Sequence, residues 1–515
     1  MPDREDLEAL RARRAYVEDD ARPEAVAKRH AAGGRTAREN VADLTDPGSF
    51  VEYGALAIAP QRGRRDVQEL IERTPADGLV GGTARVNGHA CAVLAYDYMV
   101  LAGTQGAVGH RKKDRLFELI ERMRLPTVFY AEGGGGRPGD TDYPAVSALD
   151  TRAFALWARL SGLVPRIAVV AGRCFAGNAV IAGSSDLIVA TENVSIGMGG
   201  PAMILGGGLG HVDPDDVGPL DVQTANGVID VVAADEAEAT VLTKRLLAYF
   251  QGVAPPGAEP DQTALRDMVP ERRRRAYNVH PIVETLADAE SVTFLRDRFA
   301  PEMVTALARI EGRPVGIIAN NTMHMAGAIT SAGADKAARL MQLCDAFGLP
   351  VISLVDTPGM MVGPEAEATG LVRHCCRLLV AGAALRVPLV AVVLRRGYGL
   401  GAQAMVAGSL HEPLLTVAWP SAELGPMGLE GAVRLGLRRE LETIADEAER
   451  ERRVRELTAL AEENAKAANA AALFELDDVI DPADTRRLIA STLAAADSAA
   501  GAPPPAHARG FVDTW

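Results

Sequence analysis

The sequence predicts an α/β protein in which one strand–turn–helix unit occurs twice. From Leu389 to Leu394 a continuous apolar run is typical of a strand buried on both faces of a parallel sheet. Gly397, Gly399 and Gly401 follow, and small helix-forming residues begin at Ala402. Such glycines let another molecule approach the backbone, and the first turn of a helix has unpaired N–H groups. The stretch is compatible with an oxyanion site or with an ordinary strand-to-helix connection.

A second copy of this pattern lies 224 residues earlier. Segment 85–95 aligns with 309–319 at an offset of 309 − 85 = 224, and Leu125-Pro126 aligns with Leu349-Pro350 at the same offset. Segment 164–170 matches 387–393 one residue out of step. We expect the turn Phe175-Ala176-Gly177 to return to the offset, opposite Gly399-Leu400-Gly401. A register kept over roughly a hundred residues predicts two homologous α/β domains, each with one glycine-turn site.

Size and composition narrow the class of protein. The 515 residues are enough for two large cores, and 48% hydrophobic with 24% charged residues is typical of a soluble globular chain. A net charge of −14 argues against a general nucleic-acid binder, which needs a basic face. No apolar run approaches the length that spans a membrane. Five cysteines, few and odd in number, favour a reducing cytoplasmic location without a disulfide framework.

Composition shifts divide the chain into five expected segments. The first is heavily charged and the third is rich in proline and arginine, which favours solvated or extended structure over a core. The segments are a solvated helical arm over 1–45, a first domain over 46–252, an extended linker over 253–277, a second domain over 278–495 and a flexible tail over 496–515.

Two further stretches have a predicted structure. Glu132 and the run Gly133–Gly136 follow a buried strand over 127–131, but the lysine-serine ending of a phosphate loop is absent. We interpret the run as a mobile loop near the site, with a disordered glycine linker as the alternative. Short helices are expected over 178–185 and 402–409, and one long amphipathic helix over 438–472.

Side-chain nucleophiles and metal ligands are hard to find in this sequence. No Gly-x-Ser-x-Gly elbow occurs at either glycine turn, and no cluster has metal-ligand spacing. His110, His324 and His374 lie in apolar or helical settings, and we interpret them as structural. What remains is chemistry by backbone N–H groups directed at a developing oxyanion. Such groups suit enolate formation from a thioester.

The chain resembles the carboxyltransferase (beta) subunit of biotin-dependent acyl-CoA carboxylases, which has a tandem duplicated crotonase-like (ClpP/crotonase) α/β fold. The similarity extends over nearly the whole length. The matching stretches are Thr36–Asn40, Asp46–Phe50, Ala334–Arg339, Cys344–Phe347, Val355–Gly359, Ala418–Pro420, Met427–Ala432 and Asp477–Pro482.

The resemblance implies an enzyme that moves CO₂ from carboxybiotin to the α-carbon of an acyl-CoA. Each half would supply one oxyanion hole, from Ala176 and Gly177 for the thioester enolate and from Leu400 and Gly401 for the biotin carbonyl. Substrate-binding positions would be Gly134, Gly135, Phe175, Gly399 and Gln403, with no metal. Gln403 stands where the family reads the acyl chain. Biotin would arrive on a separate carrier protein with its biotin carboxylase, and the chain would form a homo-oligomer, a hexamer, whose site lies between subunits.

Two departures from the family pattern are visible. The family has two adjacent glycines at each turn, whereas Ala176 and Leu400 replace one glycine in each copy. The acyl substrate therefore stays open. Two rival functions stay open as well: a biotin-independent acyl-CoA enzyme of the same fold, such as a decarboxylase or hydratase-like enzyme, and a non-catalytic scaffold subunit.

Overall fold

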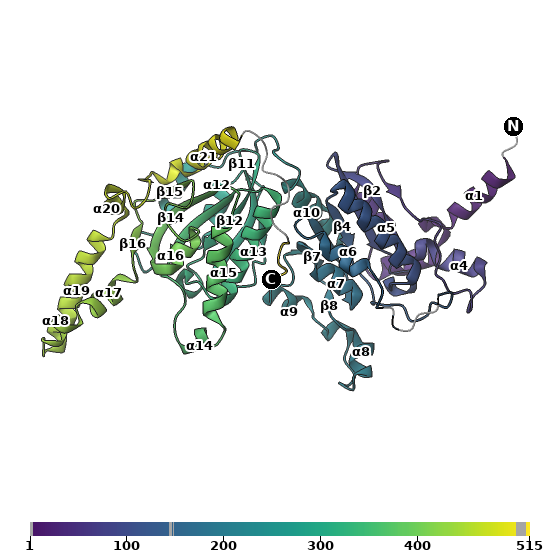
Figure 1. Cartoon of the computed structure of the whole chain (residues 1–515), viewed down its shortest axis with the longest axis horizontal. Coiled ribbons are helices and arrows are strands. Elements are labelled where there is room, and N and C mark those ends of the chain that lie inside the picture. Colours follow the sequence, from purple (N-terminus) through teal and green to yellow (C-terminus); the bar gives the residue numbers. More distant parts are fainter. Residues whose placement is uncertain (1–3, 144–146, 148, 501–510) are drawn as a thin grey trace. The chain divides into compact units, whose positions relative to one another are not determined.

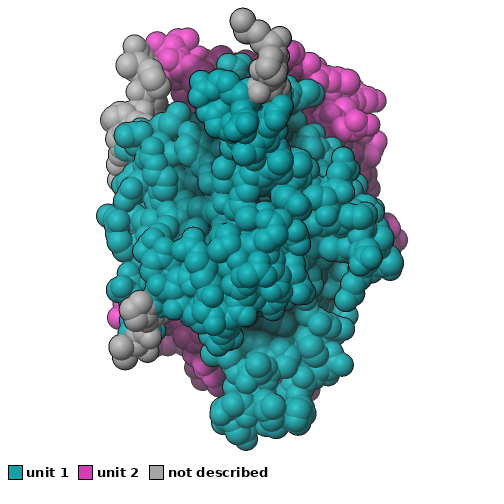
Figure 2. All heavy atoms as spheres, turned by 90° about the vertical axis from the view of Figure 1, so that its right-hand side faces the viewer, with its two compact units in different colours: residues 1–251, 509–514 teal, residues 252–508, 515 magenta. Residues whose placement is uncertain are grey.

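The computed structural model describes residues 4–143, 147, 149–500 and 511–515. The chain forms two compact units, residues 1–251 with 509–514 and residues 252–508 with 515 (Figure 2). No helix in the described part is both long and apolar enough to cross a membrane.

Unit 1 is built on a seven-stranded sheet in the order β1-β2-β3-β4-β5-β7-β9, beside a small β6-β8 pair (Figure 1). Strands β3 to β9 of the main sheet pair in parallel, and β1, β2 and β3 pair antiparallel. The strands are β1 Val51–Glu52, β2 Leu79–Val86, β3 His89–Tyr96, β4 Thr127–Tyr130, β5 Arg166–Val170, β6 Arg173–Phe175, β7 Leu187–Thr191, β8 Ser195–Gly197 and β9 Val231–Ala233. The helices are α1 Glu5–Ala15, α2 Pro23–Ala31, α3 Ala37–Leu44, α4 Val67–Arg73, α5 Ala107–Met123, α6 Ala153–Arg159, α7 Gly177–Gly183, α8 Pro201–Gly206, α9 Leu220–Ala225 and α10 Glu236–Tyr249.

Unit 2 repeats this plan around an eight-stranded sheet in the order β10-β11-β12-β13-β14-β15-β17, with β16 paired to β14. The strands are β10 Thr293–Leu295, β11 Met303–Ile310, β12 Arg313–Asn320, β13 Val351–Thr357, β14 Leu389–Tyr398, β15 Leu415–Ala418, β16 Glu423–Gly425 and β17 Asp478–Val479. The helices are α11 Leu265–Met268, α12 His280–Leu286, α13 Ser331–Phe347, α14 Pro364–Glu367, α15 Leu371–Ala383, α16 Gly399–Met405, α17 Leu429–Gly436, α18 Arg438–Glu442, α19 Glu447–Asn464, α20 Ala467–Ala472 and α21 Thr485–Ala500.

The predicted repeat is visible in the strand registers. Ala92 pairs with Thr127 in unit 1, and Gly316 pairs with Val351 in unit 2, so both partners differ by 224. The central strands are buried along their length because helices cover both faces, which explains their continuous apolar runs. In unit 1 the core is centred on Trp157, whose ring lies 5.0 Å from that of Phe117.

Several sequence-based expectations were wrong. The segment 1–45 is not solvated throughout, because Arg22 and Asn40 are buried and α3 buries Val41 and Leu44, although α1 buries no residue. The segment 253–277 is not extended throughout, since Leu265 of α11 joins the core of unit 2.

The expected single helix over 438–472 is instead three helices, α18, α19 and α20. In the expected flexible tail, residues 496–500 continue α21, and Val512 is buried and exchanges two hydrogen bonds with the Ser161 hydroxyl. Residues 501–510 lie outside the described residues.

Candidate active site

Each unit has a tight turn where a strand enters a short helix. In unit 1 Ala176 joins β6 to α7 with φ 51° and ψ −122°, and in unit 2 Gly399 begins α16 with φ 58°. A positive φ suits glycine, so Ala176 carries backbone strain of about 1–3 kcal/mol. The surrounding structure holds it there, because its N–H donates to the carbonyl of Gly197 at 3.1 Å.

The two turns correspond at an offset of 223, so our alignment of Gly177 with Gly401 was wrong. Thr127 pairs with Arg166 and Val351 with Leu389, and the second partners differ by 223. The shift persists into the turn, where Phe175 pairs with Gly197 and Tyr398 with Gly425. Ala176 is therefore equivalent to Gly399, Gly177 to Leu400 and Asn178 to Gly401. The glycine spacing of the second copy allowed both alignments. The strand before the turn, which matched one residue out of step in the sequence, already indicated the offset of 223.

The glycine loop of unit 1 lies against its turn. A Cβ on Gly135 would stand 2.8 Å from the Cβ of Ala176. The Gly134 N–H donates to Ala102 O at 3.1 Å, and the Gly135 carbonyl accepts from Gln105 N–H at 2.7 Å. The loop therefore packs on the turn and is held by backbone hydrogen bonds. Its mobility and its part in the site stay predictions.

Two backbone donors, one on the glycine loop of unit 1 and one at its turn, have no acceptor among the described residues. They are the N–H groups of Gly136, whose neighbours on both sides bond to Gln105, and of Gly177, the first residue of α7. The N–H of Ala176 is occupied by Gly197. We take Gly136 and Gly177 as the donor pair of this turn, and Gly136 was missed in the sequence analysis.

Unit 2 has the same arrangement. Ile329 N–H donates to Gly359 O at 3.0 Å and Met361 N–H donates to Ile329 O at 2.8 Å, which leaves the Met360 N–H between them without an acceptor in the described part of the chain. Leu400 is the second residue of α16 and is 64% exposed. Met360 is equivalent to Gly136, since 360 − 136 = 224, so the repeat could have identified both.

Gly401 has a packing role. A Cβ at this position would lie 2.6 Å from the carbonyl carbon of Gly359 and 2.9 Å from the Met360 nitrogen. Only glycine allows the helix and the loop to approach this closely. Gly401 is buried whereas Leu400 is 64% exposed, so we take Leu400 as the candidate donor of the turn in unit 2.

Asn178 stands in unit 1 at the position equivalent to Gly401 of unit 2. Its Oδ1 accepts from Gly135 N–H and from Gln105 Nε2, each at 3.1 Å, and its Nδ2 donates to the carbonyls of Gly103 and Glu132 at 3.3 Å. Lys113 is fully buried and donates to Gln105 Oε1. Burial lowers the pKa of Lys113 to about 7.

The three histidines show no catalytic arrangement. Burial lowers the pKa of His110 to about 3, so it is neutral near pH 7, and its ring meets Phe154 edge-on. His374 Nδ1 lies 2.6 Å from Asp335, which also binds Arg377. His324 is exposed before a short 3₁₀ turn. Among the described residues, no group of three or more His, Cys, Asp or Glu side chains could hold a metal ion.

Gln403 is exposed on α16 and lines a cavity of about 710 Å³ in unit 2. Gly399 and Leu400 form the wall nearest the turn, and Leu424, Pro426 and Leu473 supply apolar surface. This cavity brings together three of the residues predicted from the sequence. In unit 1, Gly134 and Gly135 belong to the glycine loop, and Phe175 ends β6 beside the turn.

Comparison with known proteins gives a consistent result. The carboxyl transferase domain family matches residues 28–510. The methylmalonyl-CoA carboxyltransferase 12S subunit of Propionibacterium freudenreichii subsp. shermanii is 33% identical over 503 residues, which cover 95% of this chain and 93% of that protein.

Two solved structures show the same fold. A single-chain, multi-domain long-chain acyl-CoA carboxylase is 53% identical with a TM-score of 0.91, and the match covers 95% of this chain but 49% of that chain. The transcarboxylase 12S hexamer with methylmalonyl-CoA and methylmalonic acid bound is 31% identical with a TM-score of 0.85, over 98% of both chains. This likeness confirms the predicted tandem crotonase-like fold.

Proposed function

Because this chain belongs to the carboxyl transferase family of acyl-CoA carboxylases, we propose that it moves a carboxyl group from carboxybiotin on a separate carrier protein to the α-carbon of an acyl-CoA. The chain is a carboxyltransferase, and relatives with that activity match it over nearly its whole length. The single-chain carboxylase is about twice as long, so its other activities are left to partner chains in our proposal.

The observation that carries the proposal is the pair of unpaired N–H groups that recurs in each unit. Gly136 and Gly177 supply it in unit 1, and Met360 and Leu400 supply it in unit 2. Preorganised donors of this kind stabilise a negative charge that develops on a carbonyl oxygen. We assign the first pair to the thioester oxygen of the acyl-CoA enolate and the second to the ureido carbonyl oxygen of biotin.

The residues of unit 2 fit biotin. A ureido oxygen accepts hydrogen bonds, and Leu400, one of the two donor residues, lines a cavity of about 710 Å³ whose wall includes Leu424, Pro426 and Leu473. When bound, biotin supplies the carboxyl group and a ring nitrogen that acts as base. Met360 and Leu400 would orient the ring, and Leu424 and Leu473 would exclude water from it.

The residues of unit 1 need no side-chain acid or base under this proposal. Gly136 and Gly177 hold the enolate oxygen, and Asn178 fixes the loop that carries the first donor. The enolate α-carbon would attack the CO₂ that is released when the N–carboxyl bond of carboxybiotin breaks, and the α-proton would pass to the freed ring nitrogen. Gly136 and Gly177 would keep the enolate oxygen bound throughout.

The proposal also covers the oligomeric state of the chain, its partner proteins and its location in the cell. The transcarboxylase 12S relative is described as a hexamer, which supports a hexameric core for this chain. We also propose a biotin carboxylase with a biotin carboxyl carrier as the partner. The cytoplasm stays a prediction from the cysteine content.

A transfer assay with free biotin tests the function and its two rivals together. The purified chain is incubated with malonyl-CoA or methylmalonyl-CoA, with and without free biotin, and the decarboxylated CoA ester is measured. We expect product only when biotin is present. Product without biotin would support a biotin-independent decarboxylase. Binding of the CoA ester without product in either mixture would support a scaffold subunit.

A further inference from the structure

In each unit, a carboxylate with little exposed surface stands immediately before the loop that carries the Gly136 or Met360 N–H donor. Glu132 precedes the loop of Gly136, and Asp356 precedes that of Met360, at the common offset of 224. Their side chains are 12% and 0% exposed. A carboxylate at such depth needs a cationic partner, because an unpaired buried charge is costly. The way in which this partner is supplied differs between the units.

In unit 2 the partner comes from the neighbouring strand. Arg395 Nε lies 3.0 Å from Asp356 Oδ2, and Arg396 Nε lies 2.8 Å from Oδ1. Both arginines belong to β14, which leads directly into the glycine turn. The strand therefore fixes the loop and the turn as one block.

In unit 1 the equivalent strand does not supply the cationic partner of Glu132. At the offset of 223, Arg395 corresponds to Gly172 and Arg396 to Arg173. A Cβ on Gly172 would lie 2.7 Å from Glu132 Oε1, so glycine makes room for the carboxylate, and Arg173 pairs with Asp215 instead.

The missing cation is supplied by the N-terminal helix α2. Arg29 Nη1 lies 2.9 Å from Glu132 Oε1 and Nη2 lies 2.6 Å from Oε2, a two-point contact across 103 residues of sequence. The same guanidinium donates to Glu236 and to the Arg35 carbonyl. The fork geometry fixes the direction of the carboxylate as well as its charge.

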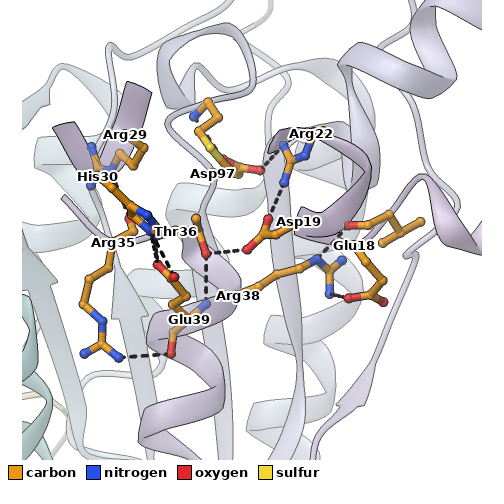
Figure 3. Close-up of polar contacts among 12 residues, drawn as sticks. Glu18, Asp19, Arg22, Arg29, His30, Arg35, Thr36, Arg38, Glu39 and Asp97 are labelled. Carbon is orange, nitrogen blue, oxygen red and sulfur yellow. Dashed lines mark hydrogen bonds and ion pairs between the residues drawn. The ribbon is translucent and has the colours of Figure 1, made fainter. Parts of the chain in front are cut away.

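The segment that carries Arg29 is anchored to unit 1 on its own account. Figure 3 shows Arg22 pointing to Asp97 and Asp19, at 2.6 and 2.9 Å, and Thr36 bonded to Asp19. Residues 19–40 are thus a folded part of unit 1. This anchoring gives Arg29 a defined position from which to hold Glu132.

We propose that Arg29 is a positioning residue of the first oxyanion site, which acts through Glu132 on the loop that presents the Gly136 N–H. The inference rests on the proposed function, in which that N–H binds the enolate oxygen. Helix α2 performs in unit 1 the task that β14 performs in unit 2. A loosened loop would place the donor poorly while the CoA ester still binds, so turnover falls and KM changes little.

The test compares Arg29→Met with Lys28→Met in the full chain, with methylmalonyl-CoA and free biotin. Lys28 is exposed on the same helix, so its variant removes the same charge without touching Glu132. We expect Arg29→Met to lower kcat at least tenfold with KM within about threefold, Arg29→Lys to recover part of the loss, and Lys28→Met to match wild type. An unchanged kcat in Arg29→Met overturns the inference.

A double variant separates positioning from charge balance. Arg29→Met with Glu132→Leu removes both buried charges, so the thermal midpoint should recover towards wild type while kcat stays low. Recovery of both quantities would mean that the pair serves only stability, and the inference would fail.

Amide hydrogen exchange over residues 133–137 tests whether Arg29 holds the loop, and it needs no measurement of turnover. We expect faster exchange in Arg29→Met than in wild type and in Lys28→Met. If wild type transfers no carboxyl group, the proposed function fails, yet this exchange difference still decides whether Arg29 holds the loop. Equal exchange in all three proteins would overturn the inference.

Discussion

The side-chain oxygen of Asn178 accepts a hydrogen bond from the backbone N–H of Gly135 at 3.1 Å. The helix that supplies one donor, Gly177, therefore also fixes the loop that supplies the other, Gly136. In unit 2 the equivalent residue is Gly401, and direct backbone contact with Gly359 replaces the side-chain bond. The two sites reach the same arrangement by different means.

Asn178→Ala should lower kcat at least tenfold, because Gly135, Gln105 and two carbonyl groups lose their partner. The measurement is transfer from methylmalonyl-CoA to free biotin, with the thermal midpoint measured beside it. Asn193→Ala, at an exposed turn, is the control. A folded Asn178→Ala protein with wild-type kcat would show that the loop needs no support from α7.

Gly177→Pro should lower the rate roughly a thousandfold, since loss of one oxyanion donor costs about 3 kcal/mol. Proline is compatible with the first position of α7, but an added side chain would press on Gln105 and Phe154 at 3.0 Å. Gly177→Ala is the matched control, because it adds the Cβ and keeps the N–H. Equal rates for the two variants would locate the effect in packing instead of the donor.

Leu400→Pro should produce a similar loss, whereas Leu400→Ala should stay within a fewfold of wild type. Leu400 is exposed in the first turn of α16, so proline removes its N–H without breaking a helical hydrogen bond. The transfer rates of both variants are measured with free biotin and with a biotinylated carrier. If Leu400→Pro is fully active, the donor of unit 2 is another amide.

Much of the fold was accessible from the sequence because the repeat is local and regular. The register of 224 predicted two α/β units, and the glycine turns marked both sites. The one-residue shift was visible in the strand before the turn, but alternate glycines fit two registers, and we wrongly expected the turn to return to the offset of 224. Arg29 and Asn178 were missed for a different reason: their partners lie 103 and 43 residues away in sequence, and only the folded chain brings them together.

Stability should depend on pH through Lys113. Its pKa is about 7 in the folded chain and near the ordinary 10.5 when unfolded, so between these values only the unfolded chain binds the proton. The free energy of unfolding therefore rises with pH in this window. Relative to Lys113→Met, wild type should gain about 2–3 kcal/mol between pH 7 and pH 9. Urea unfolding at both pH values measures this gain, and the difference in stability between wild type and Lys28→Met should stay the same at the two pH values. A pH-independent difference between wild type and Lys113→Met would mean that Lys113 is charged in both states.

Substrate choice is predicted to depend on Gln403. The residue is exposed on α16 and lines the cavity beside Leu400 that we assign to biotin. A polar side chain as long as many small acyl groups can there narrow the space left for an acyl chain next to the biotin ring, or bond a functionalised chain. Gln403→Ile should change the ratio of kcat/KM between short and longer acyl-CoAs, because one methylene contact is worth about 1–3 kcal/mol. Acetyl-, propionyl-, butyryl- and a long-chain acyl-CoA, each assayed with wild type and variant, provide the comparison. Ser409→Ala, on the wall of the same cavity, controls for a general change of its surface. An unchanged ratio with activity retained would show that Gln403 does not contact the acyl chain.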